Sequence, residues 1–122
     1  MIVFDSYAWF EYFFGTSKGQ KVRGYIDNSK EIIVTPAHVF YEVKNKLIRE
    51  NKPFNDWIRF MSERSLSEPF TATIAINAVD VRLKYSLKTS DAFIYATAME
   101  KKSKLLTGDQ QLKNLPQVEF LN

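Results

Sequence analysis

The chain has 122 residues and a mass of 14.2 kDa, a length that predicts a single domain over residues 1–122. Its residues are 45% hydrophobic and 25% charged, with four glycines and four prolines, which excludes a disordered or collagen-like chain. The absence of cysteine excludes disulfide frameworks, thiolate zinc sites and thiol nucleophiles. Seventeen basic and fourteen acidic side chains give a net charge of +3, which is compatible with nucleic-acid binding but does not prove it.

The sequence also bears on where the protein works. No apolar stretch is long enough to cross a membrane. The first residues lack the basic region of a secretory signal and carry an acidic residue at position 5. We therefore expect a cytoplasmic protein that does not insert into a membrane.

Through residue 50, short apolar runs alternate with segments of helical spacing. In chain order they predict a strand at 2–4, a helix at 6–14, a helix at 17–27, a strand at 31–34 and a helix from 35 to about 50. Gly15 is expected to end the first helix and Ser17 to cap the second. Thr35 is expected to cap the third helix, with Pro36 in its first position.

The second half of the chain continues this alternation. In chain order it predicts a helix at 54–65, a loop or a short irregular piece at 65–69, a helix at 73–85, a helix at 91–102, a strand at 104–107 and an edge strand at 118–121. Ile76, Val79 and Leu83 supply the helical spacing of the segment 73–85. Thr89 or Ser90 is expected to cap the next helix, which is apolar around most of its circumference and therefore predicted to be buried. Short apolar strands between helices favour an α/β fold with a mostly parallel sheet.

Acidic residues stand near the ends of four predicted elements. They are Asp5, Glu42, Asp91 and Asp109. Asp5 and Asp109 follow strands at their carboxyl ends, where open α/β sheets place their binding sites. Asp91 begins the buried helix, and Glu42 lies in the second turn of the helix after the second strand. Converging carboxylates repel one another, so such a cluster makes sense mainly as a site for a hard divalent cation such as Mg²⁺ or Mn²⁺.

Each acid also has a purely structural explanation, and the residues alone leave both explanations standing. Asp5 fits a helix N-cap, and Asp91 favours a helix N-terminus electrostatically. Glu42 can pair with the lysine four residues later, and Asp109 fits a turn after glycine. His38 is one turn before Glu42 and is expected to face solvent rather than to pair with it. The basic residues fit solvated helix faces, with some available for phosphate contacts.

Four local strings resemble the PIN domain, in particular the VapC-type toxins of toxin–antitoxin pairs. In chain order the strings are Ile2-Val3-Phe4-Asp5-Ser6, the Glu42 helix after Thr35-Pro36, Ser90-Asp91-Ala92 with Ala96 and Ala98, and Leu105-Leu106-Thr107-Gly108-Asp109. The resemblance covers essentially the whole chain. It implies a PIN-like three-layer α/β/α fold with a short, mostly parallel central sheet.

The same resemblance implies a ribonuclease that cleaves phosphodiester bonds with Mg²⁺ or Mn²⁺ held by acidic residues. Matched position by position, the catalytic and metal-binding residues would be Asp5, Glu42, Asp91 and Asp109. The supporting residues would be Ser6, Thr107 and Gln111. Many PIN proteins carry a further Asp where this chain has the uncharged Gln111. A second metal ion is therefore expected to bind weakly, or only with substrate.

The expected partners are the RNA substrate, a second copy of the chain and a VapB-like antitoxin. The aromatic run in residues 7–14 is too apolar for a single buried face, so part of it is expected to form a partner surface. Two alternatives remain: a PIN-type nuclease of RNA processing or quality control without an antitoxin, and a catalytically silent PIN module that binds RNA or protein. A phosphoacceptor receiver domain is disfavoured, because the first strand is not followed by an acidic pair.

Overall fold

A computed structural model describes residues 1–122. Its strands are β1 (Ile2–Phe4), β2 (Ile33–Pro36), β3 (Leu66–Glu68), β4 (Lys104–Thr107) and β5 (Val118–Phe120). Its α-helices are α1 (Ser6–Phe13), α2 (Ser17–Asp27), α3 (Ala37–Arg49), α4 (Phe54–Arg64), α5 (Ala72–Tyr85) and α6 (Thr89–Glu100). A short 3₁₀ helix, η1 (Gln110–Leu112), follows β4. None of the helices combines the length and the apolar character needed to cross a lipid bilayer.

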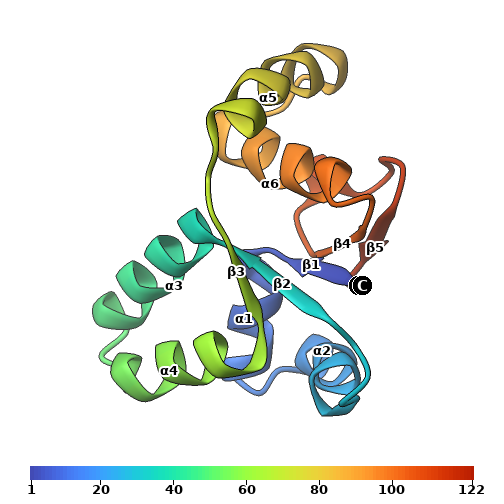
Figure 1. The fold of residues 1–122 in the computed structure, drawn as a ribbon. Coiled ribbons are helices and arrows are strands. Elements are labelled where there is room, and N and C mark those ends of the chain that lie inside the picture. Colours follow the sequence, from blue (N-terminus) through green and yellow to red (C-terminus); the bar gives the residue numbers. More distant parts are fainter.

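The five strands form one sheet in the order β3-β2-β1-β4-β5, and every neighbouring pair is parallel. Val3 of β1 is in register with Val34 on one side and Leu105 on the other. Helices α1 to α4 lie on one side of the sheet and α5 and α6 on the other, as Figure 1 shows. The three-layer α/β/α fold is therefore confirmed, with a sheet that is parallel throughout.

The chain order creates a switch point beside β1. From β1 the chain builds β2 and β3 on one side, and then crosses over to place β4 on the other side. In open α/β sheets, ligands bind outside the carboxyl ends of the strands at such a point. Because all strands are parallel, the residues that follow β1, β2 and β4 emerge at the same edge of the sheet.

The start of α3 differs from the prediction. Strand β2 extends through Pro36, and α3 begins at Ala37 without a side-chain cap. The Thr35 hydroxyl is buried, lies 2.7 Å from the Ser65 hydroxyl and accepts a hydrogen bond of 3.2 Å from the Trp9 indole nitrogen. Thr35 therefore satisfies its polar group inside the core, and the prediction that it caps the helix is wrong. Thr16, not Ser17, caps α2 through the backbone nitrogen of Gly19.

The segment 65–69 contains a strand where a loop was predicted. Leu66–Glu68 pairs with β2 at the edge of the sheet, although Leu66 and Ser67 are exposed. An exposed edge strand of three residues carries no hydrophobic pattern, so it cannot be recognised from the sequence. The capping prediction for α6 is also wrong, because the helix already includes Thr89 and Ser90 and begins after Lys88 without a side-chain cap.

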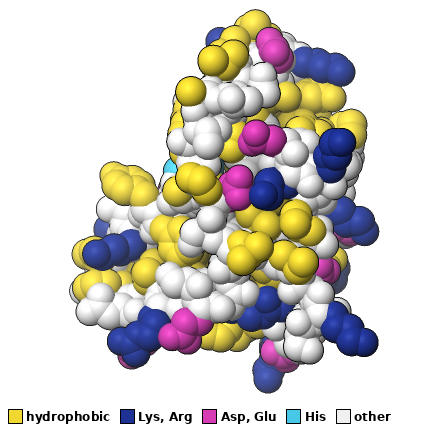
Figure 2. Space-filling model, viewed as in Figure 1, with side chains coloured by type: hydrophobic (Ala, Val, Ile, Leu, Met, Phe, Trp, Pro, Cys, Tyr) yellow, Lys and Arg dark blue, Asp and Glu magenta, His cyan; other side chains and the backbone are white.

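Helix α5 buries the face opposite to the one that its sequence pattern predicts to be buried. Ile74 and Ala78 are buried, whereas Ile76, Val79 and Leu83 are between 50% and 68% exposed. The helix packs against α6 at one end of the molecule, and Figure 2 shows hydrophobic side chains gathered at the top of the view, where α5 lies. The helical spacing of these three residues therefore marks an uncovered apolar stripe rather than the core.

Candidate active site

A pocket of about 320 Å³ contains all four of the predicted acidic residues. Asp5 follows β1, Asp109 follows β4, Glu42 comes from α3 and Asp91 from α6. The complete lining is Asp5, Ser6, Tyr7, Phe10, His38, Glu42, Lys46, Lys88, Ser90, Asp91, Ile94 and Asp109. We call this cavity the acidic pocket.

Asp5 is 8% exposed and is held by both of its carboxylate oxygens. One oxygen caps α1 by accepting a hydrogen bond of 2.9 Å from the backbone nitrogen of Ala8, and the other accepts a hydrogen bond from the Thr107 hydroxyl. Burial raises the pKa of Asp5 from 3.8 to about 7, although these two hydrogen bonds favour the charged form. The charges of Asp109 and Glu42 raise it further. Asp5 is thus both a helix cap and a member of the acidic pocket.

Asp91 and Asp109 interact directly. Burial, the charge of Asp109 and a hydrogen bond between the two side chains raise the pKa of Asp91 to about 6, while Lys88 lowers it. The backbone nitrogen of Asp109 donates a 3.0 Å hydrogen bond to the Thr107 hydroxyl. Its carboxylate accepts a 2.9 Å hydrogen bond from the backbone nitrogen of Gln111. Asp109 is therefore fixed by the turn in which it lies.

Glu42 is half-buried and points into the acidic pocket rather than pairing along its own helix. The Ser90 hydroxyl donates a hydrogen bond of 3.1 Å to its carboxylate. Burial raises the pKa of Glu42, and hydrogen bonds from Ser90 and Ser6 lower it. The predicted alternative, an ion pair with Lys46, does not form; the Lys46 ammonium lies 4.6 Å from the ring centroid of Phe10.

The Thr107-Gly108-Asp109 turn has a steric reason for its glycine. A Cβ atom at position 108 would overlap the ring of Tyr7, which also lines the acidic pocket. The Tyr7 hydroxyl accepts a hydrogen bond of 3.2 Å from the Lys18 ammonium. The close approach of this ring to the backbone therefore links α1 to the turn that carries Asp109.

His38 does not face solvent, so that prediction is wrong. It is half-buried, and its ring lies against those of Phe70 and Phe93, with centroid distances of 6.3 and 6.1 Å. Burial lowers the pKa of His38 below 6.5, so its imidazole is neutral at pH 7. Its Nε2 atom is buried without a hydrogen-bond partner.

The acidic pocket also contains Lys46, Lys88 and Ser90, to which the sequence assigns no catalytic role. Lys46 and Lys88 bring positive charge to it, and Ser90 orients Glu42. Their only sequence signal is proximity, since Lys46 follows Glu42 by one helical turn and Lys88 precedes Asp91 by three residues. Gln111 is exposed and does not line the acidic pocket.

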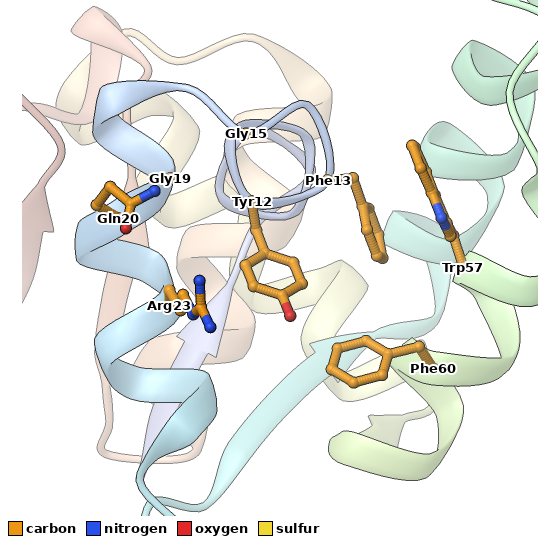
Figure 3. A pocket seen from close by; sticks show the side chains of 8 residues that line it. All are labelled: Tyr12, Phe13, Gly15, Gly19, Gln20, Arg23, Trp57 and Phe60. Carbon is orange, nitrogen blue, oxygen red and sulfur yellow. The ribbon is translucent and has the colours of Figure 1, made fainter.

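A second cavity, of about 430 Å³, lies between α1, α2 and α4 (Figure 3). Its lining residues are Tyr12, Phe13, Gly15, Gly19, Gln20, Arg23, Trp57 and Phe60. The rings of Phe13 and Trp57 stack with a centroid distance of 4.8 Å. The aromatic residues at 7–14, part of which was expected to form a partner surface, are all buried or half-buried. The second cavity, which we call the aromatic groove, is therefore the part of that expected surface that the chain leaves open.

The family profile of the PIN domain matches residues 2–118. The chain belongs to the PIN domain family. No curated protein sequence matches it. Solved structures share the fold of this PIN domain at low sequence identity.

A toxin-antitoxin complex from Klebsiella pneumoniae has a TM-score of 0.84 at 20% identity, over 100% of this chain and 98% of that one. VapBC2 from Rickettsia felis, bound to a DNA fragment from its promoter, has a TM-score of 0.77 at 14% identity and covers 100% of both chains. VapC20 from Mycobacterium tuberculosis, a Sarcin-Ricin loop cleaving toxin, has a TM-score of 0.67 at 15% identity, over 86% of this chain and 87% of that one.

PIN domains generally depend on divalent metal ions, and the donors of this PIN domain fit such an ion. Its acidic pocket offers carboxylate oxygens, the ligands that Mg²⁺ and Mn²⁺ prefer. The raised pKa values of Asp5, Glu42 and Asp91 reflect carboxylates that share a partly desolvated space. No group of three acidic or histidine side chains is arranged to hold an ion as the side chains stand, so ion binding would require the carboxylates to draw closer.

Proposed function

We propose that this PIN domain is a divalent-metal-dependent endoribonuclease that acts as the toxin of a toxin–antitoxin pair in the cytoplasm. The catalytic residues in this proposal are Asp5, Glu42, Asp91 and Asp109. The observation that carries it is the convergence of these four carboxylates, from four separate elements, on one pocket at the switch point of the sheet. Like charges gathered in a half-buried site destabilise the fold unless a cation compensates them, which supports a functional reason for the cluster.

In this proposal a Mg²⁺ or Mn²⁺ ion, when bound, neutralises charge between the carboxylates and the RNA phosphate and acidifies a water molecule. Thr107 and the Ala8 backbone nitrogen hold Asp5 in one orientation, and Ser90 does the same for Glu42. In the metal-free protein the pKa of Asp91 is about 6, and a bound cation would lower it and keep the carboxyl ionised as a ligand.

The lysines of the acidic pocket fit a role in RNA binding. Lys46 and Lys88 line the same cavity as the carboxylates. An anionic backbone needs positive charge beside such a site, and lysine ammonium groups bind phosphate oxygens without reading the base sequence. We assign these two residues to the phosphates that flank the cleaved bond.

An antitoxin partner is supported by two observations. The similar structures from Klebsiella pneumoniae and Rickettsia felis are a toxin-antitoxin complex and a VapBC assembly. The aromatic groove between α1, α2 and α4 is large enough to take apolar side chains of a peptide segment. In this proposal a VapB-like antitoxin lays such a segment along the chain and suppresses cleavage.

The proposed homodimer uses α5. Ile76, Val79 and Leu83 form an exposed aliphatic stripe on this helix, whereas the aromatic side chains of α1 are largely covered by the chain itself. A second copy packed against this stripe would remove its apolar surface from water.

The nuclease proposal is tested with purified protein and RNA in the presence of Mn²⁺. Wild type is expected to cleave, EDTA to abolish cleavage, and Asp91→Asn to lower the rate by two or more orders of magnitude. Asp80→Asn, which changes an exposed aspartate on α5, is the matched control and should cleave like wild type. Cleavage that persists in EDTA, or equally in Asp91→Asn, would overturn the proposal. A small reading frame for an antitoxin directly upstream of the gene would separate a toxin from a processing enzyme.

A further inference from the structure

Three aromatic rings form a cluster that adjoins the acidic pocket. His38 comes from α3, Phe93 from α6, and Phe70 from the connection between β3 and α5. The Phe70 and Phe93 centroids are 4.5 Å apart, and the His38 centroid lies 6.3 and 6.1 Å from them. His38 is itself part of the lining of the acidic pocket, so the cluster is continuous with the proposed cleavage site.

The cluster has features that core packing does not account for. Phe70 is 41% exposed, so a large share of an aromatic side chain faces water beside a polar cavity. The buried Nε2 atom of His38 has no hydrogen-bond partner, and unpaired buried polar atoms are rare in folded proteins. The neutral imidazole has one donor and one acceptor, so Nε2 can pair with a ligand group of either kind, according to its tautomer, once the side chains that cover it move aside to admit that group.

We propose that this cluster binds one base of the RNA strand, which stacks on Phe70 and pairs through an edge group with Nε2 of His38. The proposal rests on the nuclease function proposed above and names the part of the substrate that the site reads. A base and its phosphate are joined through one sugar, so a base site must adjoin the phosphate site, and His38 provides that junction. Aromatic rings stack on any base, whereas a histidine edge favours bases with a matching donor or acceptor. Phe70 therefore contributes affinity, and His38 contributes base preference.

The test measures binding of fluorescein-labelled oligo(A), oligo(C), oligo(G) and oligo(U) RNA in EDTA, where metal-dependent cleavage does not interfere. Inorganic polyphosphate is the base-free probe. Phe70→Ala should weaken binding of the RNA probes by about tenfold. Its affinity for polyphosphate should fall by less than about twofold, because that probe presents no base to stack. Phe70→Trp should restore RNA affinity, because it keeps an aromatic face at this position.

Two further variants separate stacking from base reading. His38→Phe keeps a ring but removes the hydrogen-bonding edge. The ratio between the highest and the lowest of the four RNA affinities should therefore fall by about threefold or more. Tyr41→Ala is the matched control, because Tyr41 is an exposed aromatic residue of α3 that belongs neither to this cluster nor to the acidic pocket. It should leave all the affinities as in wild type.

The base site is overturned if Phe70→Ala binds the RNAs like wild type, or if it loses RNA and polyphosphate affinity equally. A change of oligomeric state in Phe70→Ala with unaltered RNA affinity would overturn it too, because the ring would then cover a protein interface. This failure is distinguishable from failure of the nuclease proposal. Wild type that binds the RNAs with base preference but cleaves none of them with Mn²⁺ would refute the nuclease and leave the base site standing.

Discussion

The Thr107 hydroxyl donates a hydrogen bond to the carboxylate of Asp5, and so joins two residues that are 102 positions apart in the chain. The same hydroxyl oxygen accepts the backbone N–H of Asp109. One buried threonine at the end of β4 therefore fixes two of the four acids of the acidic pocket relative to each other. Its place beside Asp5 follows from the register of β1 with β4, in which Phe4 is paired with Leu106.

Removing this hydroxyl should affect both stability and activity. Thr107→Val leaves the Asp109 N–H without its partner, which should cost about 1–3 kcal/mol in the free energy of unfolding. It also removes a hydrogen bond that favours ionised Asp5, so the pKa of Asp5 should rise and the acid limb of the pH–rate profile should move to higher pH. Thr97→Val, at a buried hydroxyl that donates to the Phe93 carbonyl oxygen within α6, is the control. An unchanged acid limb in Thr107→Val would contradict the prediction.

The acidic pocket should make the metal-free protein less stable as pH rises. The pKa values of Asp5 and Asp91 are about 7 and about 6, whereas the ordinary value is 3.8. Between the ordinary and the raised values, the native state therefore keeps protons that the unfolded chain has released. The stability that these protons supply is complete below about pH 4 and is lost as pH climbs through about 7. The slope approaches about 1.4 kcal/mol per pH unit for each proton of difference.

Urea unfolding in EDTA at a series of pH values measures this contribution. Asp91→Asn should flatten the profile and stabilise the protein at pH 7 by about 1 kcal/mol, because it removes a repelled charge while keeping the shape. Mn²⁺ should stabilise wild type, by about 2.7 kcal/mol at a hundredfold excess over Kd, and stabilise Asp91→Asn much less. Asp80→Asn should behave as wild type. If millimolar Mn²⁺ does not change the melting temperature of the wild type, the metal site is refuted.

Gln111→Asp tests whether the missing acid weakens the metal site. The structure leaves Gln111 exposed and outside the lining of the acidic pocket, so an added charge there would act only through solvent. We expect cleavage to rise by less than about threefold at limiting Mn²⁺ and not at all at saturating Mn²⁺. A gain of tenfold or more at limiting metal would instead show that the new carboxylate reaches the ion.

Gly108 should not tolerate even one methyl group. A Cβ at this position overlaps the Tyr7 ring, so Gly108→Ala should destabilise the protein by about 1–3 kcal/mol and lower cleavage by displacing Asp109. Gly24→Ala is the matched control, because its Cβ meets open space on α2 and alanine should stabilise that helix by about 0.5–1 kcal/mol. Thermal melts of Gly108→Ala and Gly24→Ala measure these two changes in stability. Equal changes in melting temperature would contradict the close contact between Gly108 and the Tyr7 ring.

The apolar stripe of α5 should hold the homodimer together. Leu83→Glu places a charge within this exposed stripe, so it should convert a dimer to a monomer without lowering the stability of the monomer itself. Light scattering on wild type and Leu83→Glu at tens of micromolar measures the change. Phe14→Glu, at the end of the aromatic run, tests the alternative that the dimer forms through this run. Loss of the dimer in Phe14→Glu but not in Leu83→Glu would place the interface at α1.

Much of the layout could be predicted from local pattern. Strand 104–107 and the helices α1 and α2 appear within one residue of their predicted bounds, because short apolar runs and amphipathic spacing act locally. Edge strand β3 could not be predicted, since its three residues are stabilised by pairing with β2 rather than by burial of their own side chains. The buried face of α5 could not be predicted either, because this helix packs against α6 through Ile74 and Ala78, and the apolar stripe that its periodicity marks is left uncovered.

The four acids were visible in the sequence as residues near element ends, and their order along the chain supported the resemblance to the PIN domain. Their neighbours were not visible. Lys46 and Lys88 resemble any other surface lysine, and His38 looked like a solvent-facing residue until α6 and the connection before α5 enclosed it. Such residues acquire a role only from elements that are distant in sequence.

By itself, the sequence determined the type of most elements, the α/β class and the identity of the candidate acids, because these depend on hydrophobic period and on residue chemistry. Only the tertiary structure decided that Asp5 is both a helix cap and a desolvated carboxyl beside Thr107, since that requires β1 and β4 to be neighbours in register. It also decided that Glu42 turns to Ser90 instead of Lys46, and that α5 leaves its apolar stripe uncovered. The physical reason is the same in each case: burial and hydrogen-bond partners come from strand order and helix packing, which no local stretch of sequence contains.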